Sequence, residues 1–182
     1  RAVFPFFQGT PNLSAIAAKA RALAMVVSPE FKRLATLIVA DAKVLAQCLV
    51  DKGYNVLTGG TDNHIVLMDV LSRGITGVIA ERALEGCNII VNKNRIPGDQ
   101  KSAFVTSGVR LGTNSLALRG MGPGEMPQCA DLIHTVLETV KAFGDRKYDL
   151  DQAVVESVQA DVRKLCRRFP IPDYPMESGG GE

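Results

Sequence analysis

Residues 54–70 read YNVLTGGTDNHIVLMDV, and this stretch decides the fold class. Residues 54–58 and 64–70 are rich in the β-branched, aromatic and apolar residues that favour strands, and Gly59-Gly60 lies between them. Two such runs on either side of a glycine pair predict two strands joined by a turn. We therefore expect the sheet of this protein to begin here.

The chain upstream of these strands is predicted to be helical. Residues 14–27 are rich in alanine, a strong helix former. Residues 31–52 repeat apolar side chains at spacings of three and four, which predicts a second, longer helix. Ser28 and Pro29 supply the cap and the first position of that helix, and Gly53 stands where a helix typically ends.

The chain downstream contains further helices and strands. The predicted elements are a helix at 77–85, a strand at 88–92, a polar loop at 93–107, a strand at 109–112 and amphipathic helices at 126–143 and 150–169. Gly120, Gly122 and Gly124 do not follow a strand, as a dinucleotide-binding loop requires, and are interpreted as a turn. The patterns predict a small α+β domain, preceded by helices that belong to something larger.

Composition excludes several classes of protein. Hydrophobic residues make up 46% of the chain and charged residues 22%, a balance that suits a globular domain with a buried core. The formal net charge is only +2, from 21 basic and 19 acidic residues, so we expect no nucleic-acid partner and no membrane partner. No apolar run approaches the roughly 20 residues that span a bilayer.

The four cysteines are Cys48, Cys87, Cys129 and Cys166, and they form no Cys-x-x-Cys pair. We expect reduced thiols and no metal site. No secretory signal opens the chain, so a cytoplasmic protein is expected, with an organelle as the alternative. Because the sequence begins at Arg1 without an initiator Met, a fragment or a processed chain is expected.

Arg110 is the most suggestive charged residue. It stands in the apolar segment Gly108-Val109-Arg110-Leu111-Gly112, where a guanidinium needs an anionic partner. That partner is either a substrate carboxylate, held by two parallel hydrogen bonds, or an acidic residue of this chain in a structural ion pair. The residues alone leave these two interpretations equal.

Other polar residues give weaker signals. The turn at residues 8–11 precedes a helix and suits an anion, although an ordinary helix entry is the simpler interpretation. Lys93 is interpreted as a surface lysine in preference to a nucleophile. Asp62-Asn63-His64 is expected to form a hydrogen-bonded turn, and His134 is expected to be packed or at the solvent edge.

Several of these stretches together resemble one family. They are Ala2-Val3-Phe4-Pro5, Gln8-Gly9, Pro29-Glu30-Phe31, Thr58-Gly59-Gly60-Thr61-Asp62-Asn63-His64, Asn92-Lys93-Asn94, Pro97-Gly98-Asp99 and Thr106-Ser107-Gly108-Val109-Arg110-Leu111-Gly112-Thr113. Their order and spacing are similar to those of serine hydroxymethyltransferases, from residue 2 to about residue 175. The resemblance covers only the C-terminal portion of that family's sequence.

The resemblance implies a pyridoxal-phosphate enzyme of fold type I, the aspartate-aminotransferase-like fold, working as a homodimer or a tetramer. Its reaction interconverts serine and glycine with tetrahydrofolate as the one-carbon carrier. The family's domain arrangement implies that residues 1–28 end the large cofactor-binding domain and that residues 29–53 form a linking helix. Residues 54–175 would then be the small C-terminal α+β domain, and 176–182 a disordered tail.

The resemblance also implies roles for particular residues. Arg110 falls on the arginine that holds the amino-acid carboxylate, and Gly9 and Thr10 fall on the contact with the cofactor phosphate. The folate contacts fall on Asn94, Ser102, Ala103 and Phe104. The Schiff-base lysine of the family lies upstream of the match, so no catalytic residue is expected in this chain. Activity is then expected only with an N-terminal half that carries this lysine.

Two departures keep alternatives open. Thr10 replaces a glycine of the family's Gly-Gly-Pro turn, and Asn12-Leu13-Ser14 lacks the histidine usual there. These changes suggest, as one alternative, a folate-independent aldolase or transaldolase acting on threonine-like amino acids. Because the chain lacks the Schiff-base lysine, a non-catalytic interaction module derived from the family is the other.

Overall fold

A computed structural model describes residues 1–172 of this protein. The predicted disordered tail at 176–182 lies outside the described residues. The chain divides into two compact units, one spanning Arg1–Thr36 and the other starting at Leu37. Each unit is described by itself below.

The first unit consists of an irregular turn and the start of the helical region. The turn η1 spans Ala2–Phe7 and the helix α1 spans Leu13–Val26, which confirms the predicted alanine-rich helix. The Oδ1 atom of Asn12 accepts a hydrogen bond from the backbone N–H of Ala15 at 3.0 Å, so Asn12 caps α1. No residue of α1 is buried, and its exposed large apolar side chains are Leu13, Ile16, Leu23, Met25 and Val26.

The long helix α2 spans Pro29–Asp51 and confirms the helix predicted at 31–52. The hydroxyl of Ser28 accepts a hydrogen bond from the N–H of Phe31 at 3.1 Å, and Pro29 occupies the first helical position. Gly53 follows the helix with a φ of +80°, and its N–H donates to the carbonyl of Val50. A left-handed glycine of this kind is a common helix end.

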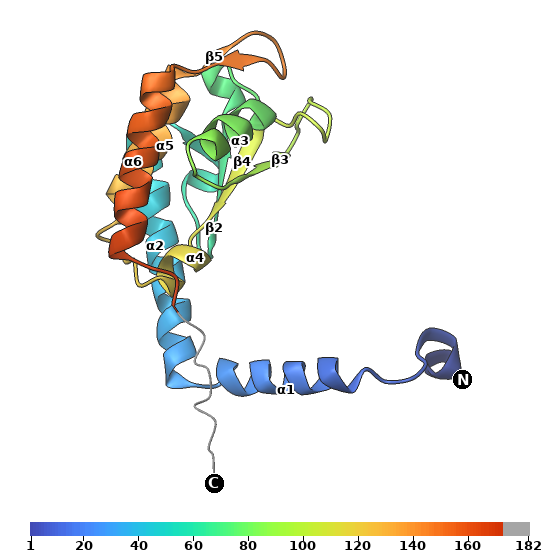
Figure 1. Cartoon of the computed structure of the whole chain (residues 1–182). Helices are drawn as coiled ribbons and strands as arrows, with labels where there is room; N and C mark the ends of the chain where they lie inside the picture. The colour runs from blue at the N-terminus through green and yellow to red at the C-terminus, as the bar shows by residue number, and fades with distance from the viewer. Residues whose placement is uncertain (173–182) are drawn as a thin grey trace. The chain divides into compact units, whose positions relative to one another are not determined.

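Four short strands form an antiparallel sheet in the second unit, in the order β1-β2-β4-β3 (Figure 1). They are β1 (Asn55–Val56), β2 (Ile65–Asp69), β3 (Asn92–Asn94) and β4 (Gly108–Gly112). In the register of the sheet, Arg110 of β4 lies opposite Leu67 of β2 on one side and Asn92 of β3 on the other. Arg110 therefore occupies the middle of the sheet.

The helices α3 (Gly77–Gly86), α5 (Met126–Thr139) and α6 (Gln152–Arg168) pack with α2 over one face of this sheet (Figure 1). Alternate strand residues point into that layer, because successive side chains of a strand face opposite sides. The buried strand residues on this face are Val66, Met68, Val109 and Leu111. Their helical partners in the core include Leu45, Leu49, Ile79, Leu84, Ile133, Val136, Val158 and Leu165. The structure thus confirms the predicted small α+β domain.

The third strand differs from its prediction. It was expected at 88–92 and lies at Asn92–Asn94. The residues after α3 form a turn instead, in which Asn88 has a φ of +64° and the N–H groups of Cys87 and Ile89 both donate to the carbonyl of Leu84. This helix-ending turn moves the start of pairing four residues along the chain.

Other boundaries differ at their ends. The first predicted strand is shorter, since residues after Val56 enter the 3-10 turn η2 (Leu57–Gly59). The helix predicted at 126–143 ends at Thr139, because β5 (Lys141–Ala142) pairs with β6 (Tyr148–Asp149) in a separate hairpin. The helix predicted at 150–169 begins at Gln152, where the side chain of Asp151 caps it. Sequence analysis did not predict the short helix α4 (Asn114–Leu118).

Gly77 marks a close approach between α3 and the segment that enters β4. Its N–H donates to the carbonyl of Thr106 at 3.0 Å. A Cβ atom at Gly77 would overlap the Thr106 hydroxyl and the backbone of Gly108, neither of which is the free end of a long side chain. Only glycine fits this contact.

We expect Gly77→Ala to lower the free energy of unfolding by more than about 2 kcal/mol, because the added methyl group must push α3 away from β4. The matched control is Gly86→Ala at the other end of α3, where a Cβ meets no atom within 4 Å. This control should keep or slightly raise the stability. Urea unfolding followed by circular dichroism measures both. Equal stabilities for the two variants would contradict the contact.

Asp41 of α2 is a buried carboxyl group without a hydrogen-bond partner among the described residues. Its side chain lies within the core, and the residue is 0% exposed. Burial raises the pKa of Asp41 to about 6, and the nearby charge of Glu125 adds to this effect. The ionised carboxylate therefore destabilises the fold at neutral pH.

We expect Asp41→Asn to raise the free energy of unfolding more at pH 7.5 than at pH 4. The pKa in the folded chain exceeds the unfolded value, so the cost of burying the charge grows as pH rises from about 4 to about 6 and is fully present above that. The stability of D41N relative to wild type should rise by about 2 kcal/mol between the two pH values.

Urea titrations at both pH values measure this difference, with Asp51→Asn on the exposed end of the same helix as the control. Asn has its own burial cost, but that cost does not change with pH. A difference between D41N and wild type that is the same at pH 4 and pH 7.5 would show that burial does not raise the pKa of Asp41.

Candidate functional site

The face of the sheet that lacks helices presents Arg110. Because Val109 and Leu111 are buried under the helices, the side chain of Arg110 between them must point to the opposite face. Arg110 is exposed there, flanked across the sheet by Leu67 and Asn92. The apolar pattern around this arginine thus positions its guanidinium on the open face.

The side chain of Arg110 makes one hydrogen bond within the described residues. Its Nη2 atom donates to the Oδ1 atom of Asn92 at 3.5 Å, a long hydrogen bond. Within residues 1–172, no carboxylate lies within 4 Å of its guanidinium, so the structural ion pair is absent from the described part of the chain. Most of its N–H donors are left for an external acceptor.

A shallow depression of about 390 Å³ surrounds Arg110. Its polar lining includes the side chains of His64, Asn92 and Asn114, and its apolar lining includes Ile65 and Ile90. A guanidinium beside amide and imidazole groups is an arrangement suited to a small anion such as a carboxylate. Sequence reasoning did not identify Asn92 as a neighbour of Arg110, because that contact depends on the register of β3 with β4.

Asn94 and the loop that follows it extend from the same edge of the sheet. Asn94 is two residues from Asn92 on β3, so alternation places both side chains on the face of Arg110. The amide of Asn94 donates to the carbonyl of Arg95 at 2.7 Å. Ser102, Ala103 and Phe104 lie on the loop between β3 and β4, and Phe104 is 75% exposed.

Gly9 and Thr10 belong to the first unit, just before α1. Both are exposed, and a Cβ atom at Gly9 would meet no atom within 4 Å. The backbone at this turn is therefore open to a ligand. Because α1 takes its cap from Asn12, the turn at residues 8–11 lies outside the helix itself.

Lys93 has a structural partner. Its Nζ atom lies 3.0 Å from Oε2 of Glu81 on α3, and its backbone N–H donates to Oε1 of the same residue at 2.9 Å. The half-buried ion pair ties β3 to α3. This outcome agrees with the preference for an ordinary lysine over a nucleophile, although the residue is less exposed than a surface lysine.

The two histidines also match their interpretations. His64 follows a hydrogen-bonded turn, in which Oδ1 of Asn63 accepts from the N–H of Ile65 at 2.8 Å. His134 is half-buried, and its Nδ1 atom lies 3.1 Å from the hydroxyl of Tyr54. Within residues 1–172, no group of three or more acidic, His or Cys side chains is arranged to hold a metal ion.

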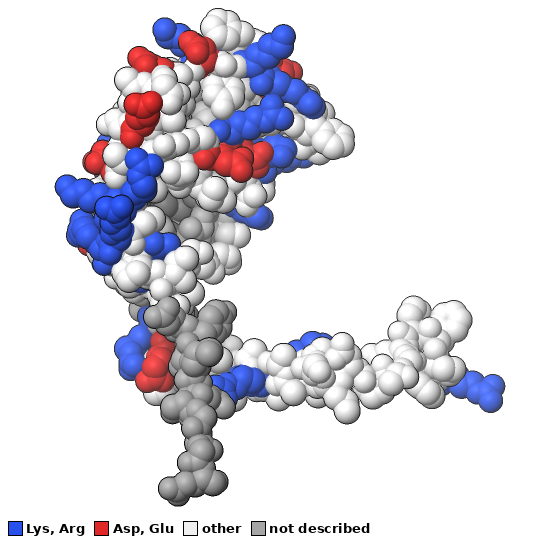
Figure 2. All heavy atoms as spheres, in the orientation of Figure 1, with Lys and Arg blue, Asp and Glu red and all other residues white. Residues whose placement is uncertain are grey.

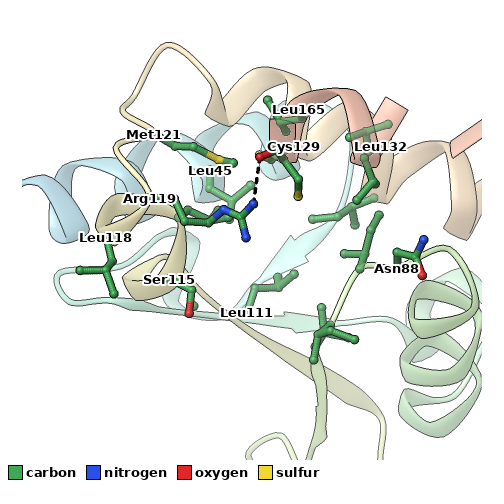
Figure 3. Close-up of a pocket in the computed structure, with 18 of the residues that line it drawn as sticks. Leu45, Asn88, Leu111, Ser115, Leu118, Arg119, Met121, Cys129, Leu132 and Leu165 are labelled. Atoms are coloured by element: carbon green, nitrogen blue, oxygen red, sulfur yellow. Dashed lines mark hydrogen bonds between the residues drawn. The ribbon is translucent and has the colours of Figure 1, made fainter. Parts of the chain in front are cut away.

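A second cavity, of about 560 Å³, lies on the helical side of the sheet (Figure 3). Its walls are mainly apolar and include Leu45, Leu111, Leu132 and Leu165. The guanidinium of Arg119, which also lines this cavity, donates hydrogen bonds to the main-chain carbonyls of Phe169 at 2.7 Å and Cys166 at 3.1 Å. These bonds cap the C-terminal end of α6.

The thiol of Cys129 also lines this cavity. Burial, with nearby acidic groups, raises the pKa of Cys129 to about 11, so the thiol is protonated at neutral pH. The four cysteines are free, and the burial of Cys129 makes it a poor nucleophile. Without an available charge or an activated nucleophile, this cavity is a poorer candidate than the depression at Arg110.

Basic side chains gather over α6 on the side of the molecule drawn in Figure 2. They include Arg163, Lys164, Arg167 and Arg168, which line one surface pocket. Among the described residues, no helix combines the length and the apolar character that a membrane span requires.

Comparison with known proteins places the chain in a family. The sequence model of the family described as serine hydroxymethyltransferase matches residues 1–133. A serine hydroxymethyltransferase of Halorhodospira halophila (strain DSM 244 / SL1) is 43% identical over 169 residues. The alignment covers 93% of this chain and 38% of that relative.

An α/β chain with these matches falls in a family of transferases. In particular, the chain belongs to the serine hydroxymethyltransferase family. It spans a little over a third of the length of the curated relative.

Proposed function

We propose that this chain supplies the amino-acid and folate contacts of a pyridoxal-phosphate-dependent serine hydroxymethyltransferase, which interconverts serine and glycine. The observation that carries this proposal is the exposed guanidinium of Arg110, held by Asn92 without a carboxylate partner in residues 1–172. Family membership supports the same activity. Arg110 then binds the substrate rather than stabilising the fold.

Arg110 would hold the substrate carboxylate by two parallel hydrogen bonds. A planar guanidinium fixes both carboxylate oxygens, which limits rotation of the amino acid about its Cα atom. The rigid, centrally placed strand β4 is a suitable support, because its neighbours on both sides fix its backbone. Asn92 would keep the guanidinium oriented before substrate arrives.

The residues at the start of the chain fit the cofactor phosphate. The open backbone at Gly9 leaves room for an anion, and the neighbouring Thr10 offers a hydroxyl donor. Bound pyridoxal phosphate supplies an electron sink for negative charge that develops on the amino acid. The fold-type-I architecture and the large-domain assignment of residues 1–28 belong to this proposal.

The folate contacts are proposed for Asn94, Ser102, Ala103 and Phe104. The amide of Asn94 and the hydroxyl of Ser102 offer hydrogen bonds to a polar ring edge. The exposed ring of Phe104 offers an apolar face on which a flat heterocycle can pack. Retention of these groups favours a tetrahydrofolate-dependent reaction over a folate-independent aldolase.

The remaining parts of the enzyme are proposed to come from outside this chain. The lysine that binds the cofactor would be supplied by an upstream polypeptide, since the chain covers only 38% of its relative. We propose that residues 29–53 link the domains and that the complete enzyme is a cytoplasmic homodimer or tetramer. α1 exposes several large apolar side chains. Exposed apolar patches of this kind usually mark a surface that contacts another protein, which supports an oligomer or a contact with the upstream polypeptide.

We expect Arg110→Gln to lower kcat/KM for serine about 100-fold or more in the complete enzyme, since removal of a charged two-bond contact costs about 3 kcal/mol. The complete enzyme here means this chain together with the upstream polypeptide. Arg163→Gln on α6, which alters an exposed arginine away from the site, is the matched control. Steady-state kinetics with serine and tetrahydrofolate measure both variants.

Three outcomes would contradict the proposal. Serine cleavage at the full rate without tetrahydrofolate would indicate a folate-independent aldolase. Unchanged kinetics in R110Q, or no binding of pyridoxal phosphate by the complete assembly, would favour a non-catalytic interaction module.

A further inference from the structure

Asp99 stands at the centre of the loop between β3 and β4, and its carboxylate gathers four hydrogen bonds. Its Oδ1 atom accepts from the N–H of Lys101 at 2.8 Å and from the hydroxyl of Ser107 at 2.6 Å. Its Oδ2 atom accepts from the N–H of Ser107 at 2.9 Å and from the N–H of Ile96 at 3.3 Å. Both oxygens of the carboxylate are thus used.

These contacts join the two ends of the loop. Ile96 follows β3 almost directly, and Ser107 immediately precedes β4. The carboxylate of Asp99 therefore closes the loop at its base, and residues 102–104 form the part that projects beyond. The guanidinium of Arg95 adds a fifth contact, from Nη2 to the main-chain carbonyl of Asp99 at 3.1 Å.

The base of the loop is also fixed to the sheet. The carbonyl of Ser107 accepts hydrogen bonds from the N–H groups of Val70 and Leu71, which follow β2, at 3.0 and 3.2 Å. A Cβ atom at Gly108 would collide with Ile96 and with the carbonyl of Met68, so the backbone is closely packed at this point. Asp99 consequently connects the loop to a part of the sheet that has little freedom.

A carboxylate is the group that this arrangement requires. All four of its partners are donors, and an ionised carboxylate is an acceptor at both oxygens. Burial alone raises the pKa of Asp99, but its hydrogen bonds, that of Ser107 first, outweigh burial and lower the pKa to about 2. The side chain is therefore ionised throughout the neutral range.

We propose that Asp99 is a positioning residue, whose carboxylate holds the loop closed so that residues 102–104 are presented rigidly to the folate co-substrate on the open face of the sheet. The inference rests on the proposed function for the identity of the ligand. Its physical basis is preorganisation, since a loop that is already ordered loses less conformational entropy when it binds. The exposed ring of Phe104 depends on that order, because no aromatic partner fixes it within the described residues.

The first experiment measures how well ordered the loop is and requires no enzyme activity. In Asp99→Asn, the amide nitrogen replaces one acceptor oxygen and faces donors, so about half of the four hydrogen bonds are lost. We expect the amides of Ile96, Lys101 and Ser107 to exchange with solvent at least 10-fold faster by NMR. The amides of β2 should change less than 2-fold, which reports that the sheet remains folded.

A matched control removes another aspartate that contacts the loop from outside. Asp145 pairs with the Nζ atom of Lys101 at 2.7 Å, so Asp145→Asn breaks a contact of the loop while the Asp99 carboxylate stays intact. We expect less than a 3-fold change in the same amides for D145N. Equal acceleration in D99N and D145N, or none in D99N, would overturn the anchoring role of Asp99.

The second experiment uses the complete enzyme and separates KM from kcat. We expect D99N to raise KM for tetrahydrofolate at least 10-fold, with KM for serine changed less than 2-fold. Ser107→Ala removes one of the four bonds and should give a smaller rise in the same constant. S107A also keeps the test decisive if D99N fails to fold, since an unchanged folate KM in a folded S107A would count against the proposal.

The outcomes distinguish this inference from the proposed function. A fall in kcat with both KM values unchanged would mean that Asp99 only affects the amount of folded enzyme, and it would overturn the positioning role. If wild-type enzyme turns over serine with tetrahydrofolate and D99N keeps its folate KM, the inference fails and the function stands. If wild-type enzyme shows no folate-dependent turnover, the proposed function fails, and the folate role of Asp99 fails with it.

Discussion

The register of β4 in the four-stranded sheet is the constraint on which the rest of the site depends. Burial of Val109 and Leu111 against the helices fixes the orientation of this strand, because a shift by one residue would turn Arg110 into the core. Leaving a guanidinium unpaired in that core costs far more than the strand gains from pairing in the wrong register. The two hydrophobic neighbours thus determine where the charge is available.

The sheet connects this charge with the loop that follows β3. Asn92 and Arg110 lie opposite each other, and the loop between their strands returns through Asp99 to Ser107, just before β4 begins. The same backbone therefore carries a closed loop with an exposed aromatic ring and a guanidinium that has no carboxylate partner within residues 1–172. On the other side of the sheet, apolar side chains of α2, α5 and α6 form the core, which also contains the buried carboxyl group of Asp41.

Local periodicity in the sequence predicted the helix α2, and residue type predicted its Ser28 cap and its Gly53 end. The outward direction of Arg110 was not predicted, because it depends on the burial of Val109 and Leu111 against the helices. The position of β3 did not follow, because the turn at Asn88 depends on its positive φ and on two bonds to Leu84 that join the end of α3 to this segment. The contact of Asn92 with Arg110 depends on the register of β3 with β4, and the four hydrogen bonds of Asp99 depend on how the loop closes. The types of the residues alone do not predict either of these. The large domain and the oligomer stay predictions.

The most direct test of the account is a crystal structure of the complete enzyme with glycine bound, read at the guanidinium of Arg110. If Arg110 binds the substrate, two nitrogen–oxygen distances of about 2.7–3.0 Å are expected between this guanidinium and the glycine carboxylate. A glycine carboxylate bound elsewhere, with Arg110 paired to an acidic side chain of the upstream polypeptide, would contradict the account. In that case the cation on the open face of the sheet would be structural, and substrate recognition would lie outside this chain.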